Sequence, residues 1–160
     1  MVVDVVVEIP QGSQNKYEVD HESGRIRLDR VLFSPFHYPT DYGYVPDTLS
    51  EDGDPIDVMV LISQPTFPGC VLRARVVGML AMSDENGVDN KILAVAEDDP
   101  RFAQVRELED VTPHLLKEIA HFFGVYKTLE NKPTAVGNWE SRATGESMVT
   151  ASIERYRQGS

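Results

Sequence analysis

Hydrophobic and polar positions alternate in a way that predicts strands over the first two thirds of the chain. Residues 3–9 are rich in β-branched side chains and carry a charge at every fourth position, which is typical of a strand. The segments 17–20 and 26–29 alternate apolar with polar residues. We expect a hairpin there, with residues 21–24 as its loop and Gly24 supplying a positive φ.

Three longer apolar runs predict further strands. The run 58–62 is wholly apolar, so we expect it to be buried, and the runs 71–82 and 92–96 supply two more strands. The segment 34–55 is different, because four prolines and two glycines interrupt regular pairing. It also holds one phenylalanine and three tyrosines, which favours a packed functional loop over a linker.

The last third of the chain has the pattern of helices. Thr112 followed by Pro113 predicts an N-cap with proline at the first helical position. Apolar side chains then recur at helical spacing, at Leu115, Ile119, Phe122 and Tyr126.

A second helix is expected after residue 139, with Val149, Ile153 and Tyr156 on one face, although Gly145 disfavours its first turns. Strands first and helices afterwards favour a mainly β fold, a small barrel or curled sheet with helices packed outside it. At 160 residues and 17.9 kDa, the whole chain 1–160 is expected to form one domain.

Composition and charge narrow the possible functions. The chain is 41% apolar and 26% charged, as in a folded globular domain. Its net charge of −11 argues against binding nucleic acid through a broadly basic surface, because phosphate neutralisation needs clustered lysine and arginine. The charge does not exclude a small anionic substrate, since bound metal ions or a local cationic pocket can reverse the field at one site.

The cysteine count and the absence of long apolar segments point to the cytoplasm. Cys70 is the only cysteine, so intrachain disulfides and multi-cysteine zinc sites are excluded, and we expect it to be a buried small apolar residue. The N-terminal residues lack the pattern of a signal peptide. The longest uncharged stretch, 58–72, is shorter than the ~20 residues of a membrane span. The sequence therefore predicts a soluble, cytoplasmic protein.

Two acidic clusters carry the candidate chemistry. Asp52, Asp54 and Asp57 stand directly before the buried run 58–62, and Gly and Pro between them allow a turn that brings them together. Carboxylates held close repel each other unless cations lie between them, and oxygen ligands suit Mg²⁺, Mn²⁺ or Ca²⁺. The alternative is a solvated acidic turn. An EF-hand is excluded, because the glycine and the final glutamate that its loop needs are missing.

The second cluster, 84–91, also falls in a turn between two strands and also fails the EF-hand pattern. Taken alone it is an ordinary hairpin tip, but two such clusters in one small domain favour a site for several metal ions. Lys16, Arg30 and Lys127 add positive charge, which suits a phosphate ester or anhydride, whereas a lone surface ion pair is the alternative for each.

Other catalytic classes lack their motifs. The chain has no phosphate-binding loop, dinucleotide-binding glycine motif, H-E-x-x-H zinc motif or G-x-S-x-G nucleophile motif. His21 has no assigned role. His114 and His121 are seven residues apart, on one face of the first helix, which we expect to form part of a subunit interface.

These blocks together resemble the soluble family I inorganic pyrophosphatases in their compact bacterial form. The sequence D-G-D-P-I-D-V at 52–58 fits the family signature D-x-D-P-hydrophobic-D-hydrophobic. Further blocks agree in order and approximate spacing: E-I-P at 8–10, K-Y-E-V-D at 16–20, Y-P-T-D-Y-G-Y at 38–44, the acidic cluster 84–91, and H-F-F with Y-K within 121–127. The match runs from about residue 3 to the terminal helix.

The resemblance implies a five-stranded OB-like β-barrel with two C-terminal helices. It implies Mg²⁺-dependent hydrolysis of pyrophosphate to two orthophosphates by direct attack of a metal-activated water, with several Mg²⁺ ions in the site and Mn²⁺ as a possible substitute. It also implies a homo-oligomer, a homohexamer in bacterial relatives, with pyrophosphate as substrate and neither nucleic acid nor membrane as partner.

The resemblance also assigns roles to individual residues. Asp52, Asp57 and Asp89 would ligate the activating metal, and Asp57 would bridge to a second ion. Asp84 would hold a third ion together with Asp89. The remaining assignments are Glu18 as ligand of a fourth ion, Glu8 acting through water, Asp54 as general base, Lys16, Arg30, Tyr42, Tyr126 and Lys127 as phosphate contacts, and Tyr38, Glu85 and Lys91 as further pocket residues.

Two other functions stay open from the sequence. A metal-binding module without chemistry would bind Mg²⁺ or Ca²⁺ but release no phosphate. An OB-type nucleic-acid binder is compatible with a barrel, but the charge of −11 disfavours it.

Overall fold

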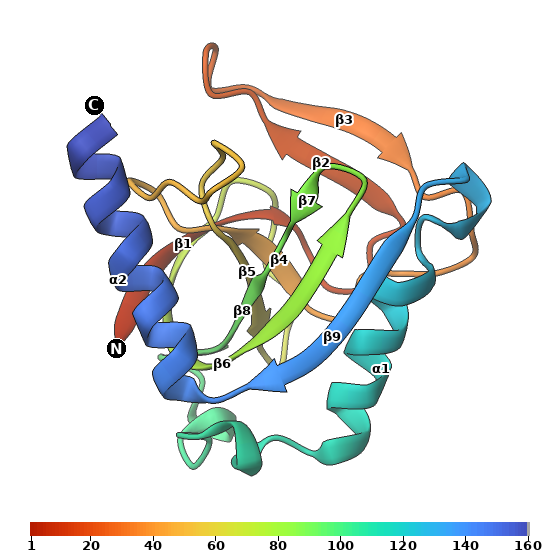
Figure 1. Ribbon diagram of the computed structural model, residues 1–160. Coiled ribbons are helices and arrows are strands. Elements are labelled where there is room, and N and C mark those ends of the chain that lie inside the picture. The colour runs from red at the N-terminus through yellow and green to blue at the C-terminus, as the bar shows by residue number, and fades with distance from the viewer. Residues whose placement is uncertain (160) are drawn as a thin grey trace.

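The computed structural model describes residues 1–159, and five of its strands pair in a closed ring (Figure 1). In order around the ring these are β1 (Val2–Ile9), β4 (Asp41–Tyr44), β5 (Asp57–Leu61), β8 (Lys91–Ala96) and β6 (Val71–Asp84), and β6 pairs with β1 again. The pairing of β5 with β8 is parallel, and the other four pairings are antiparallel. The expected mainly β, five-stranded OB-like fold with two C-terminal helices is confirmed.

The remaining elements are attached to this ring. The strands β7 (Gly87–Val88) and β9 (Thr134–Glu140) both pair with β6. The strands β2 (Asn15–Val19) and β3 (Ile26–Val31) form a separate hairpin above the ring, and α1 (Pro113–Val125) and α2 (Arg142–Gly159) lie on opposite sides of it (Figure 1). Three short 3-10 helices complete the chain: η1 (Pro100–Phe102), η2 (Leu108–Asp110) and η3 (Thr128–Glu130). No helix within residues 1–159 is both long and apolar enough to cross a membrane.

The strand β5 shows why the run 58–62 is apolar throughout. Val58 and Val60 pack in a cluster that includes Val149 of α2. Met59 and Leu61 point the other way, into a cluster that includes aromatic residues of α1. Both faces of the strand are therefore buried, as the sequence predicts.

The sequence prediction was wrong about part of the segment 34–55, because β4 lies within it. Proline interrupts the chain on either side, and only four residues pair with β1 and β5. The pairing with β1 requires a glycine at position 43, since a Cβ there would lie 2.0 Å from the carbonyl oxygen of Val6. The absence of a side chain, which weakens a strand in isolation, is here what permits the strand to form.

The first helix begins at Pro113 as expected, with one difference at its N-cap. Thr112 occupies the N-cap position, but its side chain makes no capping hydrogen bond. The apolar face is as predicted, because Ile119, Phe122 and Tyr126 are buried.

The second helix differs from the prediction at both ends of its apolar face. Val149 is fully buried and Ile153 partly buried, but Tyr156 is 39% exposed. The helix begins at Arg142, before Gly145, although a glycine in the first turns was expected to disfavour it. A Cβ at this position would lie 2.8 Å from the carbonyl oxygen of Gly78, so the glycine allows α2 to approach β6 closely.

Two further features departed from the sequence prediction. The strand β9 was not expected. Its residues are partly or largely exposed, and buried and exposed positions do not alternate cleanly along it. Cys70 was expected to be buried, but it lies in the turn before β6 and is only half-buried.

Asp99 caps η1 and also holds the segment after β5, so its replacement by alanine should lower the melting temperature. Its carboxylate accepts hydrogen bonds from the backbone N–H of Ser63 at 2.8 Å and of Arg101 at 3.1 Å. We expect a decrease of about 2–4 °C, measured by circular dichroism. The control is Asp98→Ala, because the neighbouring Asp98 forms only an exposed ion pair with Arg73 and should contribute little.

The carboxylate of Asp99 also makes the stability of the fold depend on pH in the acid range. The hydrogen bonds from Ser63 and Arg101 lower the pKa of Asp99 to about 2. The ionised form of Asp99 is thus favoured in the folded state. Its contribution to the free energy of unfolding is complete above the ordinary carboxyl pKa and is lost as the pH falls through about 2. Asp99→Asn should make the free energy of unfolding less dependent on pH between the ordinary carboxyl pKa and about 2. An unchanged profile would contradict the assignment.

Candidate active site

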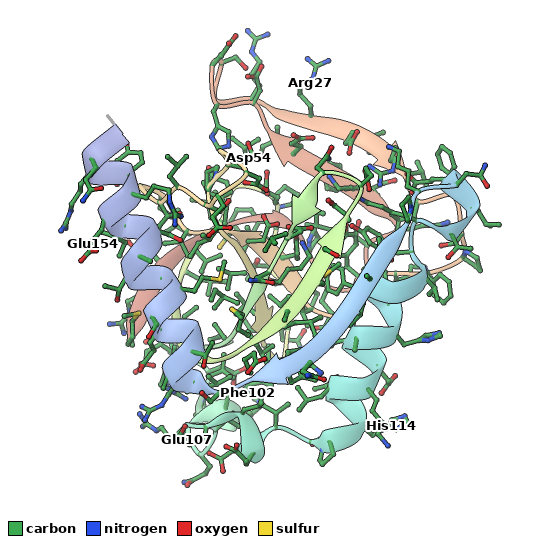
Figure 2. The ribbon with its side chains drawn as sticks, in the orientation of Figure 1. Arg27, Asp54, Phe102, Glu107, His114 and Glu154 are labelled. Carbon is green, nitrogen blue, oxygen red and sulfur yellow. The ribbon has the colours of Figure 1, made fainter. Side chains whose placement is uncertain are left out.

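A cleft of about 500 Å³ opens between the β2–β3 hairpin and one end of the ring. Figure 2 shows Asp54 on the side of the molecule that carries this hairpin. Twelve of the fifteen side chains predicted for the site line the cleft: Glu8, Lys16, Glu18, Tyr42, Asp52, Asp54, Asp57, Asp84, Asp89, Lys91, Tyr126 and Lys127. Residues from four separate parts of the chain are thus brought together as the sequence analysis expects.

The first acidic cluster lies in the loop between β4 and β5. The hydrogen bond from the N–H of Val45 to the carbonyl oxygen of Ile56, at 3.1 Å, closes the base of the loop. At its tip, the carboxylate of Asp52 accepts from the N–H of Asp54 at 3.0 Å and from the hydroxyl of Ser50. Asp57 is the first residue of β5, so pairing with the neighbouring strands fixes its backbone.

Lys91 stands at the centre of the carboxylates. The parallel pairing places it opposite Asp57, and its Nζ lies 3.1 Å from Asp57 Oδ2 and 3.0 Å from Asp89 Oδ2. It also donates to the hydroxyl of Tyr42 at 2.7 Å, and the residue is 1% exposed. Burial alone would lower the pKa of Lys91, but Asp57 and Asp89 outweigh it and raise the pKa above its ordinary value. These carboxylates thus already converge on a cation.

Several carboxylates in the cleft are held in an environment that disfavours their charge. Burial raises the pKa of Glu8 to about 7, although the N–H of Val19 donates to it at 2.8 Å. Burial likewise raises the pKa of Asp89 to about 6, with Lys91 opposing the effect and Asp57 adding to it. Burial and the nearby Asp52 raise the pKa of Asp54. Bound cations would relieve this repulsion.

The donor set fits hard metal ions, but the site is not preformed. Every metal ligand predicted for the cleft is a carboxylate, which is the chemistry that Mg²⁺ and Mn²⁺ prefer. Within residues 1–159, no group of three or more acidic, histidine or cysteine side chains is already arranged to hold one ion. Metal binding would therefore require side-chain movement, chiefly at the exposed Asp52 and Asp54 and around Lys91.

The second acidic cluster forms the tip of the β6–β7 hairpin and is tied to the end of α1. Lys127 Nζ lies 3.6 Å from Asp84 Oδ2 and 3.5 Å from Glu85 Oε1. Burial lowers the pKa of Lys127, but Tyr126, Glu85 and Asp84 outweigh it, so the pKa is raised. Glu85 itself does not line the cleft and reaches it only through this contact.

Arg30 and Tyr38 also lie outside the cleft lining. Arg30 is held by Asp29 at 2.7 Å and by Glu130 at 2.9 Å, and Asp29 holds Lys16 at 3.0 Å. Tyr38 is 2% exposed, in an aromatic cluster with its ring centroid 5.5 Å from that of Tyr42. It therefore supports a cleft residue from behind.

The cleft also includes four residues to which no role was assigned from the sequence: His21, Tyr44, Pro55 and Asn86. The ring of His21 packs edge-on against Tyr44 with centroids 5.1 Å apart. Tyr44 and Pro55 fall inside the blocks described above, and His21 directly follows the block at 16–20, so proximity to these blocks is the signal that could have found them. His114 and His121 are exposed and lie elsewhere, and Figure 2 shows His114 on the outer side of α1.

Comparisons with known proteins agree with this geometry. The family model described as inorganic pyrophosphatase matches residues 5–157. The inorganic pyrophosphatase of Geobacillus stearothermophilus is 50% identical, over 98% of this chain and 95% of its own. That of Streptomyces coelicolor is 51% identical, over 98% and 97%. The crystal structure of the Thermus thermophilus inorganic pyrophosphatase superposes with a TM-score of 0.96 at 45% identity, covering 98% of this chain and 91% of that one. By sequence and by fold, the chain belongs to the inorganic pyrophosphatase family.

Proposed function

We propose that the chain hydrolyses pyrophosphate to two orthophosphates at this cleft, as a metal-dependent enzyme. The observation that carries the proposal is the gathering of seven carboxylates and three lysines around one cleft of about 500 Å³. Carboxylates alone suit metal ions, and lysines alone suit an anion. Their interleaving suits a highly charged anhydride bound together with metal ions.

The proposed resident metal is Mg²⁺, with Mn²⁺ as a possible substitute. Asp52, Asp57 and Asp89 would hold the activating ion, with Asp57 shared with a second ion. Asp84 would hold a third ion together with Asp89, and Glu18 would ligate a fourth. Glu8 would act through water. When bound, such ions lower the pKa of a coordinated water and neutralise phosphate charge.

The other residues of the cleft act on the substrate and the attacking water. Asp54 is the proposed general base, and its raised pKa and exposure make it able to orient a water and take its proton. Lys16, Tyr42, Tyr126 and Lys127 would bind the phosphate groups, and Lys91 would complete the pocket. Arg30 would join them by leaving Glu130 and Asp29, whose carboxylate it shares with Lys16. No covalent intermediate is required.

A phosphate-release assay tests the proposal directly. Orthophosphate should appear from pyrophosphate only when Mg²⁺ is present, and a chelator should stop the reaction. Binding of Mg²⁺ without phosphate release would instead favour a metal-binding module. Salt-sensitive retention of single-stranded DNA would be needed to support the nucleic-acid alternative.

Domain organisation, assembly and location are proposed on the same basis. The chain 1–160 would form a single domain that assembles as a homohexamer in the cytoplasm, with the exposed face of α1 that carries His114 and His121 at an interface. Sedimentation or light scattering of the purified protein would give its mass. A monomer would contradict the assembly without affecting the proposed reaction.

A further inference from the structure

The terminal helix α2 is hydrogen-bonded to the acidic loop between β4 and β5. The N–H of Leu49 donates to the carbonyl oxygen of Ser152 at 3.0 Å. The guanidinium of Arg155 donates to the carbonyl oxygen of Leu49 at 2.7 Å. Both backbone polar groups of Leu49 are therefore held by one turn of the helix. Arg155 is 106 residues away from Leu49 in the chain.

Hydrogen bonds continue from Leu49 to the carboxylate of Asp52. The next residue, Ser50, donates from its N–H to the carbonyl oxygen of Asp54 at 2.7 Å, and its hydroxyl donates to Asp52. The N–H of Gly53 donates back to the carbonyl oxygen of Ser50 at 3.1 Å. The segment 49–54 is thus one hydrogen-bonded turn, and Leu49 is where α2 holds it.

Between this loop and α2 lies a second cavity, of about 200 Å³. Asp52, Asp57 and Asp89 line one side, and Met148 and Ala151 of the helix line the other. A cavity leaves the groups around it without packing partners on that side. The hydrogen bonds at Leu49 therefore link the loop directly to α2 beside this cavity.

The two acidic residues of the loop differ in how they are fixed. Asp57 belongs to β5 and is paired on both sides. Asp52 lies in the turn, so its distance from Asp57 changes if the turn shifts. We infer that Arg155 is a positioning residue for the metal site, which sets the place of Asp52 relative to Asp57 by holding Leu49. This inference rests on the proposed metal role of Asp52.

The test is Arg155→Met, which keeps most of the aliphatic stem and removes the donor. Titration calorimetry of the full-length, substrate-free protein with Mg²⁺ should show the Kd of the tightest step rising about three- to tenfold. In the activity assay, the Mg²⁺ concentration for half-maximal rate should rise similarly, while kcat at saturating Mg²⁺ stays within about twofold. Arg155→Lys retains a donor and should recover at least part of the affinity.

The matched control is Arg142→Met, on the same helix. Arg142 contacts Glu107 at 2.8 Å, away from the acidic loop, so this variant should bind Mg²⁺ as the parent does. Ser50→Ala tests the path itself, because it removes the hydrogen bond from the Ser50 hydroxyl to Asp52. If both residues act through the same turn, the effects of Arg155→Met and Ser50→Ala on the Kd should not multiply.

The outcomes separate this inference from the proposed function. Parental Mg²⁺ affinity in Arg155→Met, an equal loss in Arg142→Met, or fully multiplicative effects with Ser50→Ala would each overturn the inference while leaving the enzyme proposal standing. If Arg155→Met fails to fold, Arg155→Lys and Ser50→Ala decide alone. If the parent neither binds Mg²⁺ nor releases phosphate, both the proposed function and the inference are wrong.

Discussion

Replacing Asp57 with asparagine is expected to reduce phosphate release by about a hundredfold or more. The change exchanges one carboxylate oxygen for an amide nitrogen at the residue proposed to bridge two metal ions, so it removes both a ligand and a negative charge. The fold should persist, because the backbone of Asp57 is held by sheet pairing and Lys91 keeps its contact with Asp89 at 3.0 Å. The measurement is the initial rate of orthophosphate release at saturating Mg²⁺.

The control for this variant is Asp98→Asn, the same chemical change at an exposed residue. Asp98 pairs with Arg73 at 2.7 Å and does not line the cleft. The Asp98→Asn variant should retain the parental rate. Comparing the two variants separates the loss of a metal ligand from the loss of one negative charge. If Asp57→Asn also turned over pyrophosphate at the parental rate, its role as a bridging ligand would be wrong.

Gly43→Ala should lower the free energy of unfolding by at least about 3 kcal/mol or prevent folding. The added Cβ would lie 2.0 Å from the carbonyl oxygen of Val6 and 2.9 Å from the Cα of Val7. Both are backbone atoms of β1, so the clash cannot be relieved by turning a side chain. The two strands would have to separate at their pairing, in the buried part of the ring.

Urea unfolding followed by circular dichroism measures this effect. Gly124→Ala, in α1, is the contrasting variant, because its Cβ would make only an ordinary contact of 3.7 Å with Val136. Since alanine favours a helix over glycine by up to about 1 kcal/mol, that variant should be neutral or slightly stabilised. Equal stability of Gly43→Ala and the parent would mean that β1 and β4 do not approach as described.

The sequence predicted elements well where a single pattern dominates. The run 58–62 is apolar at every position, and the structure buries both faces of that strand. The prediction from sequence failed at β4, because the prolines and glycines of the segment 34–55 indicate a loop. The strand exists because a glycine fits against β1, and a contact of that kind depends on a partner more than thirty residues away in the chain.

The site was predictable to the extent that backbone position decides it. The blocks around Asp52 and Asp84 reach the cleft because one leads into the start of β5 and the other lies at the end of β6, at the same edge of the ring. Side-chain direction was harder to predict. Arg30 is drawn away from the cleft by Asp29 and Glu130, and Tyr38 by its aromatic neighbours. Asp29 is adjacent to Arg30 in the sequence, but Glu130 and the aromatic neighbours of Tyr38 are brought in by the tertiary structure and leave no local signal.

The closure of the ring has a consequence for biosynthesis. The two contacts of β8, with β5 and with β6, are the last of the five to become possible, since β8 ends at residue 96. Until that segment has left the ribosome, nascent chains expose unpaired strand edges that can associate with one another. Once closed, each of the five strands has a neighbour on both sides, so the mature sheet offers little template for such association.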